Sequence, residues 1–519
     1  MLKLWRNIGF EYNKKRKNLA NIASLYILLK KQENRKRNEL ANKIKEYKKR
    51  GLTISEVKKI FINMINERFI ERHYYENINQ RINLDFVSFE DFKEAKLKEL
   101  ANYGVIFDKI NEIIKINGNN KVYDFNIKDN HNFIANGFIV SNCGVRLLVS
   151  DISLKDFMTK RKEIMATLGK NIPSGVGTKS FMSVGNKEID LVLRDGVKWA
   201  VEKGFATKDD LKHIEDNGCI DLADASKVSQ KAKGRGMHQL GSLGAGNHFL
   251  EVQTVDEIID KKVAKAFGLD RDKICVLIHS GSRGLGHQVA SDYIKKMEEK
   301  YGFDKLPDRE LACAPIKSEL GKDYLAAMAC AANFGFVNRQ LLTYRLREIF
   351  TKYFPKKDLK LVYDVAHNIA KIEEHIIDGR KMKVCVHRKG ATRSFGPGRK
   401  EIPADYRKVG QPIFIPGSMG TYSYVLAGTE GAEKLTLGST AHGAGRLLSR
   451  SYAVKNITPQ NLKKELAERD VILEAGSLKG AVEEAPKAYK DVNEVVRVSH
   501  ELGIGKIVAR LRPLGVVKG

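Results

Sequence analysis

The spacing of apolar and polar residues changes twice along this chain, and each stretch predicts a different kind of structure. Over about the first 100 residues, charged side chains fall on most sides of the predicted helices, as in KKQENRKRNELANKIKEYKKR. Gly51 ends that run, and the following LTISEVKKIFINMINERFI has apolar residues at helical spacing behind a Thr/Ser start signal. We therefore predict a polar helical segment over residues 1–105.

The second stretch alternates apolar and polar residues between Asn/Gly turns, as in IIKINGNNKVYDFNIKDNHNFIANGFIV. This pattern is typical of short strands joined by hairpins. It predicts a small β-rich segment over residues 106–142.

From Cys143 onward, short strand-like runs each lead into a loop that carries glycine, histidine or asparagine. The runs are CGVRLLV, KICVLIHS, KLVYDVAHN, QPIFIPG and SYVLAG. Between them lie helical stretches such as DYLAAMACAANFGFVNRQLLTYRLREIF. We predict a mixed α+β domain over residues 143–519, although the pattern does not give the order of its strands.

Composition supports a folded protein outside the membrane. Hydrophobic residues make up 42% of the 519 residues and charged residues 30%. The chain has neither a long uninterrupted apolar run nor a signal-peptide pattern at its start, so we expect no membrane partner. The six cysteines form no CxxC pair, which argues against a disulfide framework or a zinc knuckle and suits a cytoplasmic location.

The net charge of +28 favours a polyanionic partner, because phosphate contacts release counterions. A lysine-rich proteome, whose solvated lysines bind nothing, would give the same excess.

Histidines beside small residues are the first candidates for chemistry. They occur in LGAGNHFLEV (His248), CVLIHSGSRGLGH (His279 and His287), LVYDVAHNIA (His367) and LTLGSTAHGAGR (His442). Each alone is more often a partly buried structural residue, but four in glycine-rich settings favour a metal or phosphate site, to which Cys143 could add a thiolate. A pure Cys/His set would suggest zinc and an added carboxylate would suggest manganese, so the residues leave the metal open.

Glycine-rich segments supply candidate phosphate ligands. HSGSRGLGH and HGAGR combine close-approaching backbone amides with Arg283 and Arg446, and PGSMGTYSY adds Ser418 and Ser423. Each segment alone could be an ordinary turn. The basic stretch HRKGATRSFGPGRK (387–400) is interpreted as a flexible loop that follows an RNA backbone, or else as a solvated loop.

The segment VYDFNIKDNHNFIANGFIVSNC resembles the C-terminal splicing motifs of an intein, with Asp124, His131 and Asn142 in the expected order before Cys143. An asparagine amide can attack its own carbonyl group to cut the next peptide bond, and the following thiol serves transesterification. Ser141 stands where such motifs usually have histidine, and a simple hairpin ending in Asn-Cys is the alternative.

Further upstream, WRNIGFEYNKKRKNLANIASLYILLKK resembles the tail of a LAGLIDADG endonuclease. The acidic dodecapeptide motif of that family is absent, so we expect no DNA cleavage. We also expect no splicing in cis, and interpret the chain as the downstream part of an interrupted gene product.

The domain after Cys143 resembles the RtcB family of RNA-splicing ligases. GAGNHFLE, HSGSRGLGH, DVAHN, HRKGATR, PGSMG, STAHGAGR and the terminal LRPLGVVKG occur in that family's order. The resemblance implies a GTP- and manganese-dependent ligase that joins RNA 2′,3′-cyclic phosphate or 3′-phosphate ends to 5′-hydroxyl ends in tRNA splicing and RNA repair. It implies RNA, in the form of tRNA halves, as the partner, and leaves the need for an activating protein open.

The same resemblance implies roles for single residues. Cys143, His248, His279 and His367 would hold most of a site for two Mn²⁺ ions, and His442 would be the nucleophile that carries GMP. The guanylate-binding positions would be Asn247, His248, Phe249, Leu250, Glu251, His367, Asn368, Pro416, Gly417, Ser418, Met419, Ser423, His442, Gly443, Ala444, Gly445 and Lys518.

One departure from the family pattern affects the metal site. The family has a metal-binding aspartate three residues before the cysteine, whereas this chain reads VSNCG. We therefore expect a missing ligand and weak sealing activity until an upstream half is joined. The alternatives are a metal-dependent phosphodiesterase or phosphatase without a GTP requirement, and an intein-derived splicing module.

Overall fold

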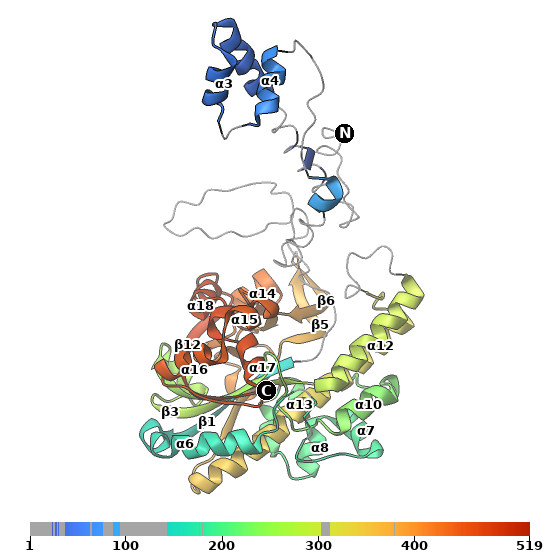
Figure 1. The fold of residues 1–519 in the computed structure, drawn as a ribbon. Helices are drawn as coiled ribbons and strands as arrows, with labels where there is room; N and C mark the ends of the chain where they lie inside the picture. Colours follow the sequence, from blue (N-terminus) through green and yellow to red (C-terminus); the bar gives the residue numbers. More distant parts are fainter. Residues whose placement is uncertain are drawn as a thin grey trace. The chain divides into compact units, whose positions relative to one another are not determined.

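The computed structural model divides the chain into two units, Met1–Phe125 and Asn126–Gly519, which are described separately (Figure 1). It describes residues 23, 26, 27, 30, 37–62, 65–75, 87–93, 143–175, 177, 178, 180–302, 312–377 and 379–519. The predicted β-rich segment, including Asp124, His131 and Asn142, lies outside these residues. Its strands and the intein resemblance therefore remain predictions.

Helices form the described part of the first unit, as the polar helical pattern predicts. Residues 37–49 are helical, and α3 (Ile54–Ile60) and α4 (Glu67–Tyr75) follow. Thr53 caps α3 through a reciprocal capping box with Glu56, which explains why the helix begins at the predicted start signal. A small core packs these helices together through Ile44, Val57, Phe61 and Ile70.

The second unit is built on one eight-stranded sheet with the strand order β4-β1-β3-β2-β12-β9-β8, in which β11 pairs with β12. Every pairing is antiparallel except the parallel pair of β11 and β12. The strands are β1 (Cys143–Ser153), β2 (Phe249–Ile258), β3 (Lys273–Gly281), β4 (Lys360–Ala366), β8 (Pro412–Ile415), β9 (Ser423–Ala427), β11 (Ile472–Ala475) and β12 (Lys506–Lys518). All five strand-like runs of the sequence are therefore strands.

Two further sheets of two strands each are separate from the eight-stranded sheet. One is the hairpin of β5 (Asn368–Ile377) and β6 (Arg380–Lys389), and the other joins β7 (Ala391–Arg393) to β10 (Ser439–Ala441). The mixed helix and sheet content confirms the predicted combination of helices and strands in this domain.

Successive side chains of each strand point to opposite faces of the sheet, and both faces are buried. In β3, Ile274, Val276 and Ile278 pack into one hydrophobic cluster, whereas Cys275 and Leu277 pack into another. Because both faces are covered, these strands read as continuous apolar runs in the sequence.

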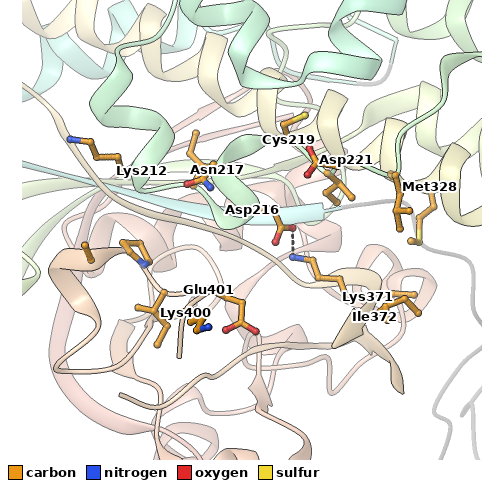
Figure 2. Close-up of a pocket in the computed structure, with 18 of the residues that line it drawn as sticks. Lys212, Asp216, Asn217, Cys219, Asp221, Met328, Lys371, Ile372, Lys400 and Glu401 are labelled. Atoms are coloured by element: carbon orange, nitrogen blue, oxygen red, sulfur yellow. Dashed lines mark hydrogen bonds and ion pairs between the residues drawn. The ribbon is translucent and has the colours of Figure 1, made fainter. Parts of the chain in front are cut away.

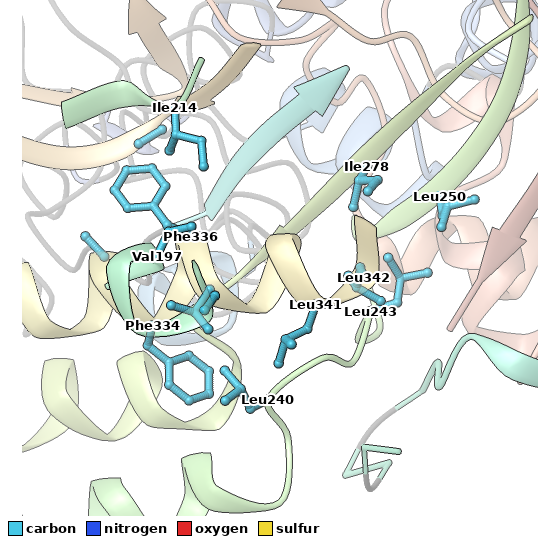
Figure 3. Close-up of a cluster of buried hydrophobic side chains, with 14 of the residues drawn as sticks. Val197, Ile214, Leu240, Leu243, Leu250, Ile278, Phe334, Phe336, Leu341 and Leu342 are labelled. Atoms are coloured by element: carbon cyan, nitrogen blue, oxygen red, sulfur yellow. The ribbon is translucent and has the colours of Figure 1, made fainter. Parts of the chain in front are cut away.

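Helices with apolar faces cover the first cluster, and the long helix α13 forms its centre. Phe334, Leu341 and Leu342 of α13 lie within it, together with Ile278 of the sheet (Figure 3). The helices on this side are α6 (Leu154–Asn171), α7 (Asn186–Asp195), α8 (Val197–Glu202), α9 (Lys208–Lys212), α10 (Gln230–Met237), α12 (Arg283–Tyr301) and α13 (Glu319–Tyr353). The predicted helical stretch DYLAAMACAANFGFVNRQLLTYRLREIF lies inside α13.

The remaining helices lie in the upper part of this unit in Figure 1 or beside the second cluster. They are α11 (Lys261–Ala266), α14 (Glu430–Thr436), α15 (Arg450–Asn456), α16 (Pro459–Glu468), α17 (Leu478–Glu483) and α18 (Val492–Glu501). Short 3-10 turns occur at Glu215–Gly218, Ala225–Lys227, Ala404–Tyr406 and Pro486–Ala488.

Two general predictions can be compared with the described residues. Among them, no helix combines the length and the hydropathy needed to span a membrane. All six cysteines are among the described residues, and no disulfide joins any two of them.

Candidate active site

Four adjacent strands, β4, β1, β3 and β2, bring the predicted cysteine and histidines to one edge of the sheet. Cys143 begins β1, and His367 directly follows the last residue of β4, so the amide of His367 donates to the carbonyl oxygen of Cys143 at 3.0 Å. His279 of β3 pairs with Val145 of β1 and with Phe249 of β2. Since neighbouring strands run antiparallel, the starts of β1 and β2 meet the ends of β3 and β4 at the same edge.

The side chains at this edge touch one another in two close pairs. Cys143 Sγ lies 3.3 Å from His248 Nε2, and His279 Nε2 lies 3.0 Å from His367 Nε2. The two pairs adjoin, because the ring centroids of His248 and His279 are 5.7 Å apart. All four side chains are buried.

Burial keeps the three imidazoles neutral. Desolvation lowers the pKa of His248, His279 and His367 well below the usual value, because a charged ring would lose its hydration. The positive charge of Arg283 lowers the pKa of His248 further. A neutral imidazole has a free lone pair, which is the form that binds a metal.

The donor set meets part of the requirement for metal binding. Two nitrogens bound to one ion at about 2.0–2.1 Å lie roughly 2.9–3.4 Å apart, and the His279–His367 pair falls in that range. As placed, the described His, Cys, Asp and Glu side chains form no group of three or more that could hold a metal ion. Each close pair therefore supplies two ligands of a possible ion, and the remaining ligands have to come from elsewhere.

Gly244 shows why a glycine-rich segment precedes His248. Its φ of +101° is one that side chains other than glycine rarely adopt, and a Cβ there would lie 1.9 Å from Arg283 Nη1 and 2.5 Å from His248 Nδ1. With no side chain in the way, Arg283 Nη1 approaches His248 Nδ1 to 3.4 Å. Gly244 thus lets the guanidinium of Arg283 approach Nδ1 of His248, whose other ring nitrogen lies beside Cys143 Sγ.

His442 lies against this cluster from a different element. Its ring centroid is 4.6 Å from that of His367, and it directly follows β10, whose Ala441 pairs with Ala391 of β7. Burial lowers the pKa of His442, and a hydrogen bond with the Gly390 carbonyl group opposes that lowering. Its Nδ1 is buried and makes no hydrogen bond with any described residue.

Several buried polar atoms on β2 and on loop 416–419, which contacts the loop after His442, make no hydrogen bond with any described residue. Beside His442 Nδ1, the set includes Ser418 Oγ, Glu251 Oε1 and Gln253 Oε1. Gln253 Nε2 connects two elements, because it donates to Glu251 Oε2 at 2.5 Å and to Ser423 Oγ at 2.9 Å. Buried polar atoms are nearly always hydrogen-bonded, so such a group indicates a place for a polar ligand.

Glu251 and Lys518 are two buried ionisable residues of this region. Burial raises the pKa of Glu251 to about 8 and lowers the pKa of Lys518 to about 8. Lys518 Nζ lies 5.5 Å from the centre of the Phe249 ring, and Lys518 pairs with Phe249 across β12 and β2. Both groups therefore change charge near neutral to mildly alkaline pH.

Comparison with known proteins agrees with this geometry. The family model described as "tRNA-splicing ligase RtcB" matches residues 114–519. The chain belongs to the RtcB family. Because the match begins upstream of Cys143, it does not test the predicted boundary at that residue.

Relatives of two kinds resemble this RtcB-family chain. The tRNA-splicing ligase RtcB of Methanocaldococcus jannaschii is 48% identical over 530 residues, covering 99% of this chain and 54% of the relative. That of Pyrococcus furiosus is 48% identical over 526 residues with the same coverage. That of Thermococcus kodakarensis is 53% identical over 385 residues, covering 73% of this chain and 80% of the relative. The chain thus spans about half the length of the first two relatives.

Most residues singled out by the RtcB resemblance lie at or beside this cluster. Cys143, His248, His279, His367 and His442 are together, as described above. The loops 416–419 and 443–445 touch, since the amide of Ala444 donates to the carbonyl oxygen of Pro416 at 3.2 Å. Asn247 and Asn368 each neighbour a cluster histidine along the chain, whereas Leu250 and Met419 are buried in the hydrophobic clusters.

Two segments predicted as glycine-rich or basic loops are at least partly regular structure. The segment after Gly281 is the first turn of α12, which begins at Arg283, and His287 is exposed on that helix. The stretch 387–400, predicted as a flexible RNA-binding loop, begins with the end of β6 and continues through β7.

Two of its three arginines, Arg388 and Arg393, are buried. Arg388 is buried and makes a two-pronged ion pair with Glu373, and Arg393 is buried against Gln411 and Tyr363. The prediction of a flexible loop is wrong for residues 387–393, because charge in a sequence does not reveal a buried partner, whereas RNA contact by this stretch stays a prediction.

Another predicted phosphate ligand is engaged elsewhere. Arg446 Nη1 lies 3.1 Å from a carboxylate oxygen of Glu484. Gln253, in contrast, was missed as a member of the site. It lies two residues after Glu251 on the same strand, so the two-residue period of β2 could have identified it.

A separate cavity of about 590 Å³ lies away from these residues (Figure 2). It adjoins Lys371 and Ile372 of β5, and none of the cluster residues lines it. Its basic residues (Lys212, Lys371, Lys400, Arg407) are equal in number to its acidic ones (Asp216, Asp221, Glu401, Asp405). Because these charges balance, the cavity does not have the character of a phosphate site.

Proposed function

We propose that residues 143–519 carry out GTP-dependent joining of RNA ends, in which a 2′,3′-cyclic phosphate or 3′-phosphate end is linked to a 5′-hydroxyl end. The observation that carries this proposal is His442, a half-buried imidazole that lies beside the Cys/His cluster and whose buried Nδ1 has no partner among the described residues. The proposed substrates are tRNA halves in splicing and broken RNA in repair, and the family membership supports this choice.

In the first step a ring nitrogen of His442 attacks the α-phosphorus of GTP. The bond from nitrogen to phosphorus forms while the bond to the β-phosphate oxygen breaks, so pyrophosphate leaves with the bonding electrons. A neutral imidazole suits this step, because it is nucleophilic and also leaves readily from phosphorus. The lowered pKa of His442 keeps it in that form.

In the following steps the guanylate moves to RNA. An oxygen of the RNA 3′-phosphate attacks the same phosphorus, and the bond to His442 breaks, which regenerates the imidazole. The 5′-hydroxyl oxygen of the second RNA end then attacks the 3′-phosphorus, loses its proton and expels GMP. A cyclic phosphate end must first be opened by water to give the 3′-phosphate.

Cys143, His248, His279 and His367 are the residues that would hold two Mn²⁺ ions. Bound divalent cations neutralise charge on a transferring phosphoryl group and orient the reacting oxygens. The neutral rings and the spacing within each close pair support this assignment.

The buried polar atoms of Glu251, Gln253 and Ser418 that have no partner among the described residues support a guanylate site next to His442. The Glu251 carboxylate can accept hydrogen bonds from the edge of guanine, and Ser418 Oγ and Lys518 Nζ can bind phosphate or ribose oxygens. The other residues of this proposed site are Asn247, Phe249, Leu250, Asn368, Pro416, Gly417, Met419, Ser423, Gly443, Ala444 and Gly445.

Labelling with α-³²P GTP tests this function against a metal-dependent phosphodiesterase or phosphatase. A ligase of this type takes up label in the presence of Mn²⁺ and releases it when RNA with a 3′-phosphate is added. A phosphodiesterase would instead cleave RNA without GTP and would never become labelled. The absence of labelling in the presence of Mn²⁺, with RNA cleavage observed, would exclude the ligase.

A second function is proposed for the segment before Cys143, namely that of an intein-derived splicing segment ending at Asn142. Two relatives align with 99% of this chain, while a shorter relative aligns with 73%. This difference is what an inserted segment in the longer proteins would produce. Mass spectrometry of the purified chain tests it: cleavage after Asn142 gives two products, and Asn142→Ala should abolish it. A single uncleaved species in both proteins would contradict cleavage.

A further inference from the structure

The β5–β6 hairpin has two faces of different character. On the inner face, Glu373, His375 and Arg388 are buried and bonded to one another. The outer face, in contrast, carries side chains that are mostly exposed. Alternation along each strand produces this division, because successive residues point to opposite faces.

Basic residues follow the outer face of β6. Lys381, Lys383 and Lys389 are exposed at alternate positions of the strand, and Cys385 and His387, the latter with a pKa lowered by burial, occupy the positions between Lys383 and Lys389 on this face. Successive residues on one face lie roughly 6.8 Å apart, which is close to the separation of phosphates along an extended RNA strand. The row from Lys381 to Lys389 is therefore roughly 27 Å long.

The row ends at the candidate active site. Lys389 pairs with Asn368 across the hairpin, and Asn368 directly follows His367. On the other side, Lys389 precedes Gly390, whose carbonyl group hydrogen-bonds with His442. An RNA strand bound along this face would thus reach His442 at one end. At its other end it would leave the protein near the start of β6.

The neighbouring residues of β5 suit a nucleic acid. Ile372 is 48% exposed and Ile376 is 74% exposed, and both lie on the same face as the lysines. Such isolated apolar side chains can contact bases or sugars without distinguishing between sequences. Glu374 is the acidic residue of this face, and it pairs with Lys381 at 2.7 Å.

We propose that the outer face of the β5–β6 hairpin binds the single-stranded RNA that leads to the reacting end, with its phosphates on Lys381, Lys383 and Lys389. The inference rests on the proposed ligase function and adds the path of its substrate. Of the stretch 387–400, predicted to follow an RNA backbone, the proposal keeps Lys389 and leaves out the buried Arg388 and Arg393. Contacts between lysines and phosphates do not distinguish one base from another, so the binding should tolerate many RNA sequences.

RNA affinity measured at several salt concentrations tests this surface in the full chain. The probe is a fluorescein-labelled single-stranded RNA with a 3′-phosphate, followed by fluorescence anisotropy. Each phosphate contact on a single strand contributes about 0.7 to the slope of log K against log salt. Lys381→Gln with Lys383→Gln should therefore lower the slope by about 1.4 and weaken binding by more than roughly tenfold at 0.1 M salt.

A matched control removes the same charge from another element. Lys463 and Lys464 are exposed on α16, and Lys464 lies 4.0 Å from Glu468, much as Lys381 is paired with Glu374. Lys463→Gln with Lys464→Gln should leave the slope nearly unchanged. Glu374→Gln should strengthen RNA binding, because it removes a negative charge that pairs with Lys381.

Equal losses of RNA affinity in the hairpin and α16 variants would overturn the proposal, since they would show that RNA is attracted by the net charge of the protein alone. An unchanged slope in the hairpin variant would also overturn it and would point to a protein partner for this face. Labelling of the wild-type chain by GTP needs no RNA and is measured in parallel. If that labelling fails, the ligase proposal falls whatever the RNA titrations show.

Discussion

The two halves of the candidate active site are built in opposite ways. The half formed by Cys143, His248, His279 and His367 consists of side chains at strand ends, locked by the antiparallel register and already in contact with one another. The half around His442, called the loop half below, joins the loops 416–419 and 443–445 to Glu251 and Gln253 of β2, and several of its buried polar atoms have no partner among the described residues.

This difference indicates what each half contributes. The strand half has a fixed arrangement of neutral donors, which is suited to ions of small size and strict geometry. The loop half leaves donors and acceptors unmatched, and a larger polar ligand would complete them. We expect changes in one half to leave binding in the other half largely intact, and the predictions below test that separation.

The largest expected effect comes from removing the imidazole of His442. His442→Ala should abolish labelling by α-³²P GTP, because no other described side chain in the loop half offers a buried neutral ring nitrogen. Manganese binding, followed by electron paramagnetic resonance of free Mn²⁺, should stay near the wild-type level. Residual labelling in this variant would contradict the assignment of the nucleophile.

The next largest effect is expected in the strand half. Cys143→Ala removes the thiolate of the first close pair and should weaken manganese binding by at least about 100-fold, more than the loss typical of an outer-sphere partner. Binding of a fluorescent GTP analogue without metal should change little. As a control, Cys275 is buried in the hydrophobic cluster and Cys275→Ala should leave manganese affinity unchanged. Equal losses in both variants would indicate general unfolding.

A third prediction concerns Arg388, which holds the segment leading to His442. Its guanidinium donates to Ser439 Oγ at 2.9 Å and to the carbonyl oxygen of Leu437 at 3.0 Å, while it also binds Glu373. Replacing both charges, as Arg388→Met with Glu373→Met, avoids a buried unpaired carboxylate. The rate of labelling should fall by roughly 10- to 100-fold, because small misplacements of a nucleophile are costly.

The same variant separates positioning from folding. The affinity for the GTP analogue and for Mn²⁺ should remain within a few-fold of wild type, so that the loss appears in the rate and not in binding. Arg388→Lys should recover part of the rate. If binding and rate fall together, Arg388 supports the fold as a whole.

The smallest expected effect is a pH dependence of GTP binding. Burial raises the pKa of Glu251 to about 8, so below that pH the carboxyl group must lose a proton before it can accept guanine hydrogen bonds. Affinity should fall by about tenfold per pH unit as the pH drops below 8. Above pH 8, Lys518, whose pKa is lowered to about 8, loses the charge that binds phosphate.

Calorimetric titration between pH 6 and 9 measures this profile, which should peak near pH 8. Glu251→Gln should remove the acidic limb and keep the alkaline one. A flat wild-type profile between pH 6 and 8 would show that the carboxylate does not contact the nucleotide.

The sequence predicts the strands and helices of the second unit well, because both faces of the sheet are buried. Runs such as KICVLIHS have no polar interruption, and the histidine at the end of β3 stands out against them. The clustering of the four metal-site candidates follows from strand ends that meet at one edge, but the order of the strands that brings them together is a property of the fold.

The segment 387–400 shows where prediction from the sequence fails. Its many charges indicate a solvated loop, but Arg388 pairs with Glu373 of the neighbouring hairpin strand and Arg393 with Gln411, both more than ten residues away in the chain. Long-range pairing of this kind leaves no local pattern. The alternation of lysines along β6 is local, by contrast, and becomes informative once the strand and its buried face are known.

Peptide mapping by mass spectrometry tests the central claim most directly. The chain is incubated with GTP and Mn²⁺, digested at neutral to alkaline pH, and searched for a peptide carrying one added GMP. The account predicts that this GMP is found on the peptide LTLGSTAHGAGR, attached to His442, and that it disappears when 3′-phosphate RNA is added. GMP on any other residue, or none in protein that binds GTP and Mn²⁺, would contradict it.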